Sequence, residues 1–282
     1  FIVSQSTRAA GCTVAVGGLG ADELFLGYGS FKRLPMLRAL SRLGSLGPVA
    51  KVAAQLLPFD AVVGRKLSHI IGSGGDLMQL SRLQRMLFFT YQRHELLRPA
   101  WRLPLDADTG PVLDPEETPT DPYNFLSAFE LRGYVQNMLL RDTDAMSMAH
   151  GLEVRVPFLD HVLVELVLSL PGSFKVRRGE QKPLLVGAMK PLLPPETYMR
   201  RKVGFNLAIP EWMKTSLRAG VEDVLLAPNE LLDPDVTAKL WKAFLRGDDP
   251  RLWSRLWGLY TLLSWLRRHV WNDDAGRLPL AA

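Results

Sequence analysis

The stretch at residues 14–31, VAVGGLGADELFLGYGSF, constrains the fold more than any other part of the chain. Three small apolar residues lead into a cluster of glycines, and two carboxylates, Asp22 and Glu23, follow directly. Glycine allows positive φ angles and lets another group approach the backbone closely. The pattern therefore predicts a strand that ends at Val16, a tight turn, and a helix that begins near Ala21.

Asp22 and Glu23 are expected in the first turn of that helix, where unpaired N–H groups and the positive end of the helix dipole favour negative charge. One interpretation is simply a well-capped helix. The other is a ligand site, because open α/β sheets bind ligands at the carboxyl ends of their strands. Asp22 would then hold Mg²⁺ against a phosphate group. The local pattern leaves both interpretations open.

Composition places the chain among globular proteins with a sizeable core. It has 282 residues, of which 47% are hydrophobic, and a formal net charge of +5. The charge permits an anionic ligand such as a nucleotide, but no basic run with interleaved aromatic residues indicates a nucleic-acid groove. Cys12 is the only cysteine, so an intrachain disulfide is excluded. We expect Cys12 to be a buried small hydrophobe and the compartment to be reducing and cytoplasmic.

Most of the remaining chain is predicted to be helical. Leucine and alanine recur at spacings of three and four in residues 34–57 and 77–97, and no run of alternating β-branched residues competes. Residues 99–122 contain six prolines and are typical of a long surface connection. They divide the chain into a glycine-turn and helical part at 1–98 and a second helical part at 123–282, without proving two domains.

The tryptophan-rich segment at residues 251–271 is the most apolar part of the chain. Only Leu256 to Leu266 separate Arg255 from Arg267. That is too short to span a bilayer, which needs roughly 20 apolar residues. We expect a helix docked on the core, and an interfacial membrane helix is the alternative.

Residues 72–76, GSGGD, resemble a phosphate loop, because glycines precede an acid and a helical pattern. The Gly-Lys-Ser/Thr ending of a Walker loop is missing. The alternative is a glycine-rich link between helices in which Asp76 caps the second helix.

The segment at residues 139–161, LLRDTDAMSMAHGLEVRVPFLDH, intersperses charged residues with apolar ones. A helix is expected to end near Arg141. Glu153, Arg155 and Asp160 lie among valine, proline, phenylalanine and leucine, and charges in such surroundings should be paired. We therefore expect these three residues to form a buried structural ion-pair network rather than to act in catalysis.

Lys182 is expected at or near the start of a helix, after a turn at Gly179. A lysine there has the wrong sign for the helix dipole and would be stabilised by an anion. One interpretation is therefore an anion-binding lysine. The other is an exposed lysine beside Glu180, and the residues alone do not decide between them.

Four segments occur in an order that closely resembles the synthetase domain of the glutamine-hydrolysing asparagine synthetase family. They are GGLGADELFLGY, LLRDTDAMSMAHGLEVRVPFLDH, GEQKPLL and RRKVGFNLAIPEW. The resemblance covers nearly the whole chain. It implies a predominantly helical α/β fold, namely part of an adenine-nucleotide α-hydrolase-like synthetase domain with a residual parallel-sheet strand.

This resemblance implies an ATP-dependent ligase that forms amide bonds. In the family, ATP converts aspartate to β-aspartyl-AMP with release of pyrophosphate, and ammonia from a glutaminase domain then displaces AMP. The expected substrates are thus ATP, aspartate or an analogue, and ammonia from glutamine, with Mg²⁺ as cofactor and no nucleic-acid or membrane partner.

The same resemblance implies roles for individual residues. Gly17, Gly18 and Gly20 are expected to line the nucleotide. Asp22 is expected to bind Mg²⁺ and pyrophosphate, and Lys182 to stabilise the charge that develops at the activated carboxylate.

Two departures from the family pattern matter. Many members read Ser-Gly-Glu-Gly where this chain has Leu19 between glycines, so a proton acceptor is replaced by an apolar side chain. The family's pyrophosphate loop, Ser-Gly-Gly-x-Asp-Ser, and its glutaminase domain have no counterpart in these residues. Three hypotheses remain: a part of an amidotransferase that needs an upstream fragment, a related lactam or peptide cyclase, and a catalytically inactive remnant or partner subunit.

Overall fold

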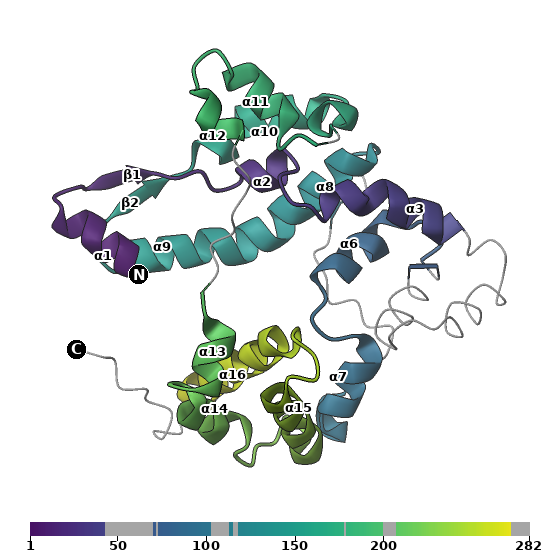
Figure 1. The fold of residues 1–282 in the computed structure, drawn as a ribbon, viewed down its shortest axis with the longest axis vertical. Coiled ribbons are helices and arrows are strands. Elements are labelled where there is room, and N and C mark those ends of the chain that lie inside the picture. The colour runs from purple at the N-terminus through teal and green to yellow at the C-terminus, as the bar shows by residue number, and fades with distance from the viewer. Residues whose placement is uncertain are drawn as a thin grey trace. The chain divides into compact units, whose positions relative to one another are not determined.

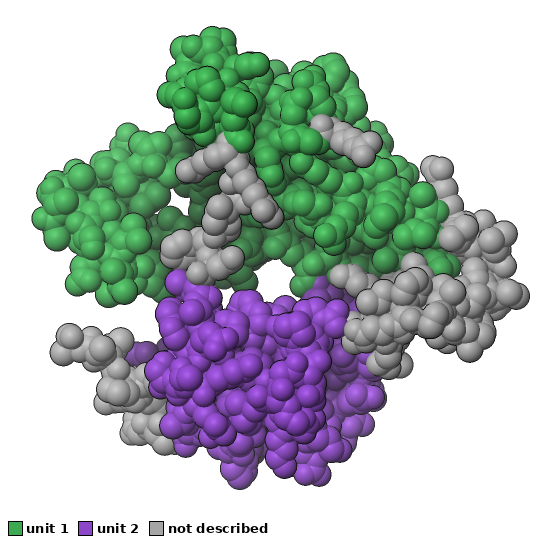
Figure 2. All heavy atoms as spheres, viewed as in Figure 1, with its two compact units in different colours: residues 1–85, 109–201 green, residues 86–108, 202–282 purple. Residues whose placement is uncertain are grey.

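The computed structural model describes residues 1–42, 70–71, 73–102, 113–114, 118–177, 179–199 and 207–271. The chain divides into two compact units, coloured green and purple in Figure 2. Unit 1 comprises Phe1–Arg85 and Thr109–Arg201, and unit 2 comprises Met86–Asp108 and Lys202–Ala282. The proline-rich connection expected at residues 99–122 therefore contributes to both units. Much of that connection, the predicted helical residues 43–57, and residues 200–206 of the RRKVGFNLAIPEW segment lie outside the described residues.

Unit 1 is mostly helical (Figure 1). In chain order its elements are α1 (Ile2–Ala9), β1 (Val14–Val16), α2 (Ala21–Leu24), the 3₁₀ helix η1 (Phe31–Arg33), α3 (Leu34–Arg42), α6 (Leu77–Arg85), α8 (Pro122–Glu130), the π-helix η4 (Leu131–Leu139), α9 (Leu140–Met148), β2 (Glu153–Arg155), the 3₁₀ helix η5 (Pro157–Leu159), α10 (His161–Ser169), the 3₁₀ helix η6 (Gly172–Lys175), α11 (Pro183–Met189) and α12 (Pro195–Met199).

Within the described residues, β1 and β2 form a parallel two-stranded sheet. Val14 pairs with Glu153 and Val16 with Arg155. The predicted strand end at Val16 and helix start at Ala21 are confirmed. The predicted fold class is likewise confirmed at the level of a predominantly helical α/β unit with a small parallel sheet. The more specific relation to adenine-nucleotide α-hydrolases stays a prediction.

A continuous helix runs from α8 through η4 to the end of α9 (Figure 1). Asp121 caps its first turn, where Oδ1 accepts hydrogen bonds from the N–H groups of Tyr123 at 2.9 Å and Asn124 at 3.0 Å. The helix end expected near Arg141 is wrong, because α9 continues to Met148. Alanine and methionine in this stretch favour the helix, and the chain leaves it before Gly151, whose φ is +64°.

α2 is short, but its apolar side chains lie in the interior of unit 1. Leu24 and Phe25 pack with Val167 of α10. Leu26, just beyond the helix, packs with Phe31 in a second cluster. This burial on both sides fixes the position of the first turn of α2, which carries the two carboxylates.

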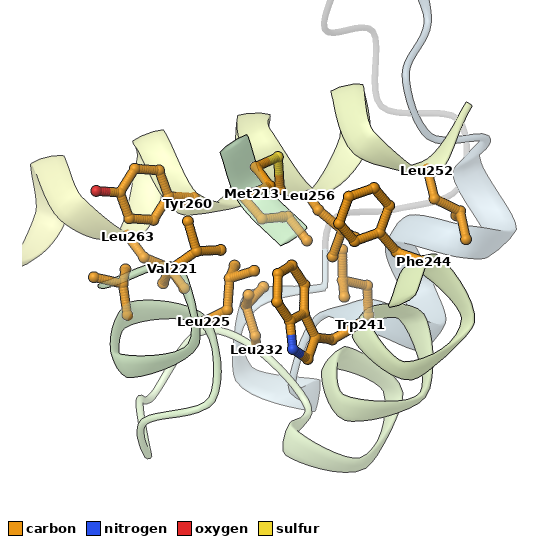
Figure 3. Packing of buried hydrophobic residues seen from close by; sticks show 13 residues of the cluster. Met213, Val221, Leu225, Leu232, Trp241, Phe244, Leu252, Leu256, Tyr260 and Leu263 are labelled. Carbon is orange, nitrogen blue, oxygen red and sulfur yellow. The ribbon is translucent and has the colours of Figure 1, made fainter. Parts of the chain in front are cut away.

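Unit 2 is a helical bundle. Its described elements are α7 (Thr90–Leu96), the 3₁₀ helix η3 (Pro99–Trp101), α13 (Ile209–Lys214), α14 (Arg218–Leu225), α15 (Pro234–Arg246) and α16 (Leu252–His269), and a β-bridge joins Leu97 to Leu232. The tryptophan-rich segment is α16, and its residues Leu256 and Leu263 are buried in the core of the unit (Figure 3). The predicted docked helix is thus confirmed. Among the described helices, none combines the length and apolar character needed to cross a membrane.

Two local expectations have different outcomes. Cys12 is exposed, which corrects the expectation of a buried residue. The reason is that the strand begins only at Val14, so Cys12 lies in the turn that follows α1. The cap proposed at Asp76 is confirmed, because its Oδ1 accepts hydrogen bonds from the N–H groups of Met78 at 2.8 Å and Gln79 at 3.4 Å at the start of α6.

Candidate active site

The glycine turn after β1 leaves space on one side and is tightly packed on the other. Gly17 continues the sheet, because its N–H donates to the carbonyl of Arg155 at 2.8 Å. A Cβ added to Gly18 would meet no atom within 4 Å, so a ligand can approach the backbone there. A Cβ on Gly20 would lie 2.2 Å from a methyl carbon of Leu159, and its φ is +90°. Internal packing and backbone conformation therefore already require glycine at position 20.

The two carboxylates in the first turn of α2 have different surroundings. Glu23 is 1% exposed, and its Oε1 accepts a hydrogen bond from the hydroxyl of Tyr28 at 2.7 Å. The side chain of Asp22 remains 25% exposed. The predicted placement of both in the first turn is confirmed, and Asp22 is the carboxylate that a ligand can reach.

Asp22 forms an ion pair with Lys182, which lies 160 positions later in the chain. The distance from Lys182 Nζ to Asp22 Oδ1 is 2.9 Å, and the lysine side chain is 27% exposed. Lys182 is the N-cap of α11, so its predicted place at the start of a helix is confirmed. Its anionic partner is Asp22 of the glycine-turn motif, so the two motifs meet at one place.

The loop that carries Lys182 is attached to the rest of unit 1 by further contacts. Lys32 Nζ donates a hydrogen bond to the carbonyl of Glu180 at 2.6 Å. Arg177 pairs with the Glu180 carboxylate at 3.3 Å. Lys182 itself has a left-handed backbone with φ 46° and ψ 55°, a conformation that costs a non-glycine residue free energy. The lysine is therefore presented by a constrained loop.

A polar layer lies behind the first turn of α2. Arg85 Nε donates to both carboxylate oxygens of Glu130 at 3.0 Å, and the guanidinium lies over the ring of Tyr134 at 4.0 Å and that of Tyr28 at 5.7 Å. Burial, and then the hydrogen bond to Glu23 and the charges of Glu23 and Asp22, raise the pKa of Tyr28 well above its ordinary value. The phenol therefore remains a hydrogen-bond donor to Glu23.

Sequence reasoning did not single out these supporting residues. For Tyr28 a signal existed, because it follows Glu23 by five positions within the same glycine-rich motif. For Arg85 and Glu130, 45 positions apart, the sequence offers no local signal that would connect them.

The expected ion-pair network differs from the observed arrangement. Glu153 and Arg155 do pair, at 2.7 Å, but their side chains are 56% and 65% exposed. Alternation along β2 places both on the same face of the strand. Asp160 instead caps α10, where its Oδ1 accepts hydrogen bonds from Val162 N–H at 3.0 Å and Leu163 N–H at 3.4 Å. The described contacts thus correct the buried three-residue network to an exposed pair and a separate helix cap.

The donor set around Asp22 suits a metal that phosphate oxygens also bind. Among the described residues, no group of three or more His, Cys, Asp or Glu side chains could enclose a metal ion. Mg²⁺ does not need such an enclosure, since it is commonly bound by one or two carboxylates together with phosphate oxygens and water. The partly exposed carboxylate of Asp22, four positions after the open backbone of Gly18, fits that mode of binding.

Comparison with known proteins gives consistent matches. The sequence model of the family described as asparagine synthase matches residues 1–267. The chain is 27% identical to asparagine synthetase [glutamine-hydrolyzing] 1 of Bacillus subtilis, over 76% of this chain and 33% of that protein. It is 30% identical to a putative asparagine synthetase [glutamine-hydrolyzing] of Mycobacterium bovis, over 76% of this chain and 32% of that protein. A more distant relative is amidase chry2 of Gibberella zeae, 22% identical over 80% of this chain.

The chain spans about a third of the length of these two asparagine synthetase relatives. No solved structure matches it significantly.

Proposed function

The chain belongs to the asparagine synthase family, and from this premise we propose that it is part of an ATP-dependent ligase that forms an amide from a carboxylate. The observation that carries the proposal is the ion pair of Asp22 with Lys182 at 2.9 Å, next to the open turn after β1. Two motifs that the family resemblance links to ATP chemistry are distant in sequence, and they meet at the carboxyl end of a parallel strand, where α/β sheets bind ligands.

The proposed reaction has two steps. The carboxylate of aspartate or an analogue attacks the α-phosphorus of ATP, the bond to the β-phosphate breaks, and pyrophosphate leaves with the bonding electrons. Ammonia derived from glutamine then attacks the acyl carbon and loses a proton, and AMP leaves. Both steps develop negative charge on oxygen, which fixed positive groups stabilise.

Each residue of the site has a role in this proposal. Gly17, Gly18 and Gly20 form the turn that the nucleotide approaches, with Gly18 giving the most open backbone. Asp22 would bind Mg²⁺, which neutralises phosphate charge when bound. Lys182 would stabilise the charge at the reacting carboxylate. Leu19 cannot accept a proton, so the proton lost by ammonia must pass to a group other than the side chain at position 19.

A partner is part of the proposal. β1 has a neighbour on one side among the described strands, and Val14 and Val16 are exposed, although parallel sheets are normally covered on both faces. We propose that an upstream fragment with the Ser-Gly-Gly-x-Asp-Ser loop adds to this sheet and supplies further pyrophosphate contacts. A glutaminase domain would supply ammonia, and we expect the 282-residue chain alone to be inactive or nearly so.

Two alternative functions remain for this chain. In a lactam or peptide cyclase, an amine of the substrate would replace ammonia. In the second, the chain is a catalytically inactive remnant or partner subunit.

The test is aspartate-dependent release of pyrophosphate from ATP, measured for the chain alone and with the upstream fragment. We expect release with the fragment, and a loss of about tenfold or more in Asp22→Asn because one ligand charge is removed. Lys182→Ala should lower turnover by orders of magnitude with little change in melting temperature. Asp76→Asn and Lys190→Ala are matched controls, since the first keeps a good helix cap and the second changes an exposed lysine.

The other outcomes are equally informative. Amide formation with release of AMP that needs no ammonia or glutamine but does need an amine substrate would favour the cyclase. Absence of release with the fragment present would favour the inactive remnant. Full activity of the chain alone would show that the upstream loop is not needed.

A further inference from the structure

The carboxylate of Asp22 occupies space that only a glycine at position 27 leaves free. A Cβ added to Gly27 would lie 2.0 Å from Asp22 Oδ1, 2.8 Å from its Cγ and 3.1 Å from its Cα. The same Oδ1 accepts the hydrogen bond from Lys182 Nζ. The orientation of Asp22 that reaches Lys182 is therefore the orientation that a side chain at position 27 would block.

Backbone conformation does not explain glycine at this position. Gly27 is not among the described glycines with positive φ, in contrast to Gly20. The φ angle of Gly27 thus gives no reason for glycine, and the close approach of the Asp22 carboxylate is the reason that the described structure offers.

Gly27 is held against the carboxylate by its own backbone hydrogen bond and by the anchoring of its two neighbours. Its N–H donates to the carbonyl of Asp22 at 2.7 Å. Leu26, with φ 55°, turns the chain back toward α2 and is itself 1% exposed in an apolar cluster. Tyr28 on the other side is anchored by its hydrogen bond to the buried Glu23 and by an edge contact with the ring of Phe31.

We propose that Gly27 is a positioning residue that gives the Asp22 carboxylate the room to face Lys182, with the Tyr28–Glu23 hydrogen bond keeping Gly27 in place. The chemistry of the site rests on the proposed function, but the placement of the carboxylate rests on geometry alone. An experiment can therefore refute the proposed function without refuting the role of Gly27, and the reverse.

Gly27→Ala should leave the fold intact and move the carboxylate. The atom nearest to the added methyl group is the end of the short Asp22 side chain, which can rotate. The backbone of Asp22 is less crowded, because its Cα would lie 3.1 Å from the added carbon and has to shift by only a few tenths of an ångström. Gly29→Ala is the matched control two positions later, because a Cβ there would meet nothing within 4 Å and its φ is not positive.

The first measurement does not depend on catalysis. Trace acetylation of lysines followed by mass spectrometry reports how freely the Lys182 amine reacts. We expect its reactivity to rise about two- to fivefold in Gly27→Ala, as loss of a partly exposed ion pair predicts, and equally in Asp22→Asn. Gly29→Ala should show the wild-type value. A wild-type value in a folded Gly27→Ala would overturn the proposal.

A double variant tests whether both changes act through the same carboxylate. In Asp22→Asn/Gly27→Ala, the reactivity of Lys182 should equal that of Asp22→Asn alone, because the second change has no carboxylate left to displace. A further rise would mean that Gly27 acts through another group and would overturn the proposal.

Tyr28→Phe covers the case in which Gly27→Ala does not fold. It removes the hydroxyl bonded to Glu23 but keeps the ring against Phe31, so a smaller rise in Lys182 reactivity is expected, and none would count against the proposal. In the assembled enzyme, Gly27→Ala should raise the KM for Mg·ATP more than it lowers kcat. Changed Lys182 reactivity without any pyrophosphate release in the wild type would refute the proposed function and leave this inference standing.

Discussion

The two units of the chain bury different kinds of side chain. Unit 2 has one large apolar core, in which leucines from α14 and α16 surround Trp241, Phe244 and Tyr260 (Figure 3). Unit 1 has smaller apolar clusters, and three of the four buried charged residues among those described belong to it. These three are Glu23, Glu130 and Lys175.

This difference indicates that unit 2 mainly provides stability, whereas unit 1 also has to orient charged groups. Burying a charged group costs free energy unless it is well paired, so unit 1 gives up stability where its carboxylates and amines are oriented. Among the described residues of unit 2, the buried charged residue is Arg267, which pairs with Asp223 at 3.3 Å. We therefore expect substitutions in unit 2 to act on stability, and several in unit 1 to act on chemistry with little loss of stability.

The largest effect on stability is expected from Leu256→Ala in α16. Leu256 is fully buried, and removing its side chain leaves a cavity in the core of unit 2. The free energy of unfolding should fall by about 2–5 kcal/mol. All seven tryptophans belong to unit 2, so denaturation followed by tryptophan fluorescence reports on that unit. Leu262→Ala, at an exposed position of the same helix, is the control, and an equal loss in that variant would contradict the assignment of the core.

A smaller effect, of opposite sign, is expected from Lys175→Met in unit 1. Lys175 is 1% exposed, and its Nζ has no hydrogen-bond partner among the described residues. Burial lowers the pKa of Lys175 from 10.5 to about 8, with the charge of Asp121 offsetting part of the shift. As the pH falls from about 10.5 to about 8, the Lys175 amine binds a proton in the unfolded chain before it does so in the folded chain. The lysine therefore lowers the free energy of unfolding over this range, and the loss stays constant below pH 8.

Lys175→Met should therefore stabilise unit 1 by about 1–3 kcal/mol at pH 7, since one pKa unit corresponds to about 1.4 kcal/mol. The gain should shrink as the pH approaches 10.5, the ordinary pKa of the amine. Circular dichroism during denaturation at several pH values measures it, with tryptophan fluorescence recorded in parallel to identify unit 2. Lys190→Met, at an exposed position, is the control. A gain in stability that does not depend on pH would contradict this prediction, because it would mean that charging the Lys175 amine costs no free energy in the folded chain.

What the sequence predicted well was local. The strand end at Val16, the helix start at Ala21 and the helix start after Lys182 each follow from glycine, capping and periodicity signals within a few residues. These signals act through backbone conformation, which neighbours in sequence determine.

What the sequence did not predict was the pairing of distant residues and their exposure. The sequence did not identify Asp22 as the partner of Lys182, because the two residues are 160 positions apart. The helix was predicted to end near Arg141, which is earlier than observed, because the alanine and methionine residues beyond that position were interpreted as packing residues. Cys12 was expected to be buried because its neighbours are apolar, although burial depends on which elements cover a segment. The roles assigned to Gly17, Gly18, Gly20, Asp22 and Lys182 stay predictions.

The smallest effect is expected from Arg155→Ala, which makes it the sharpest test of how the sheet of unit 1 is covered. An ion pair as exposed as that of Arg155 with Glu153 is well hydrated and contributes little, so the melting temperature of the 282-residue chain should stay within error of the wild type. Arg85→Ala is the comparison in the same unit, because it leaves Glu130, 2% exposed, without its guanidinium, and a clear loss is expected there. If an upstream fragment adds to the sheet and covers β2, Arg155→Ala should become costly only when that fragment is present. A large loss in the chain alone would mean that Glu153 and Arg155 are not the exposed pair described above.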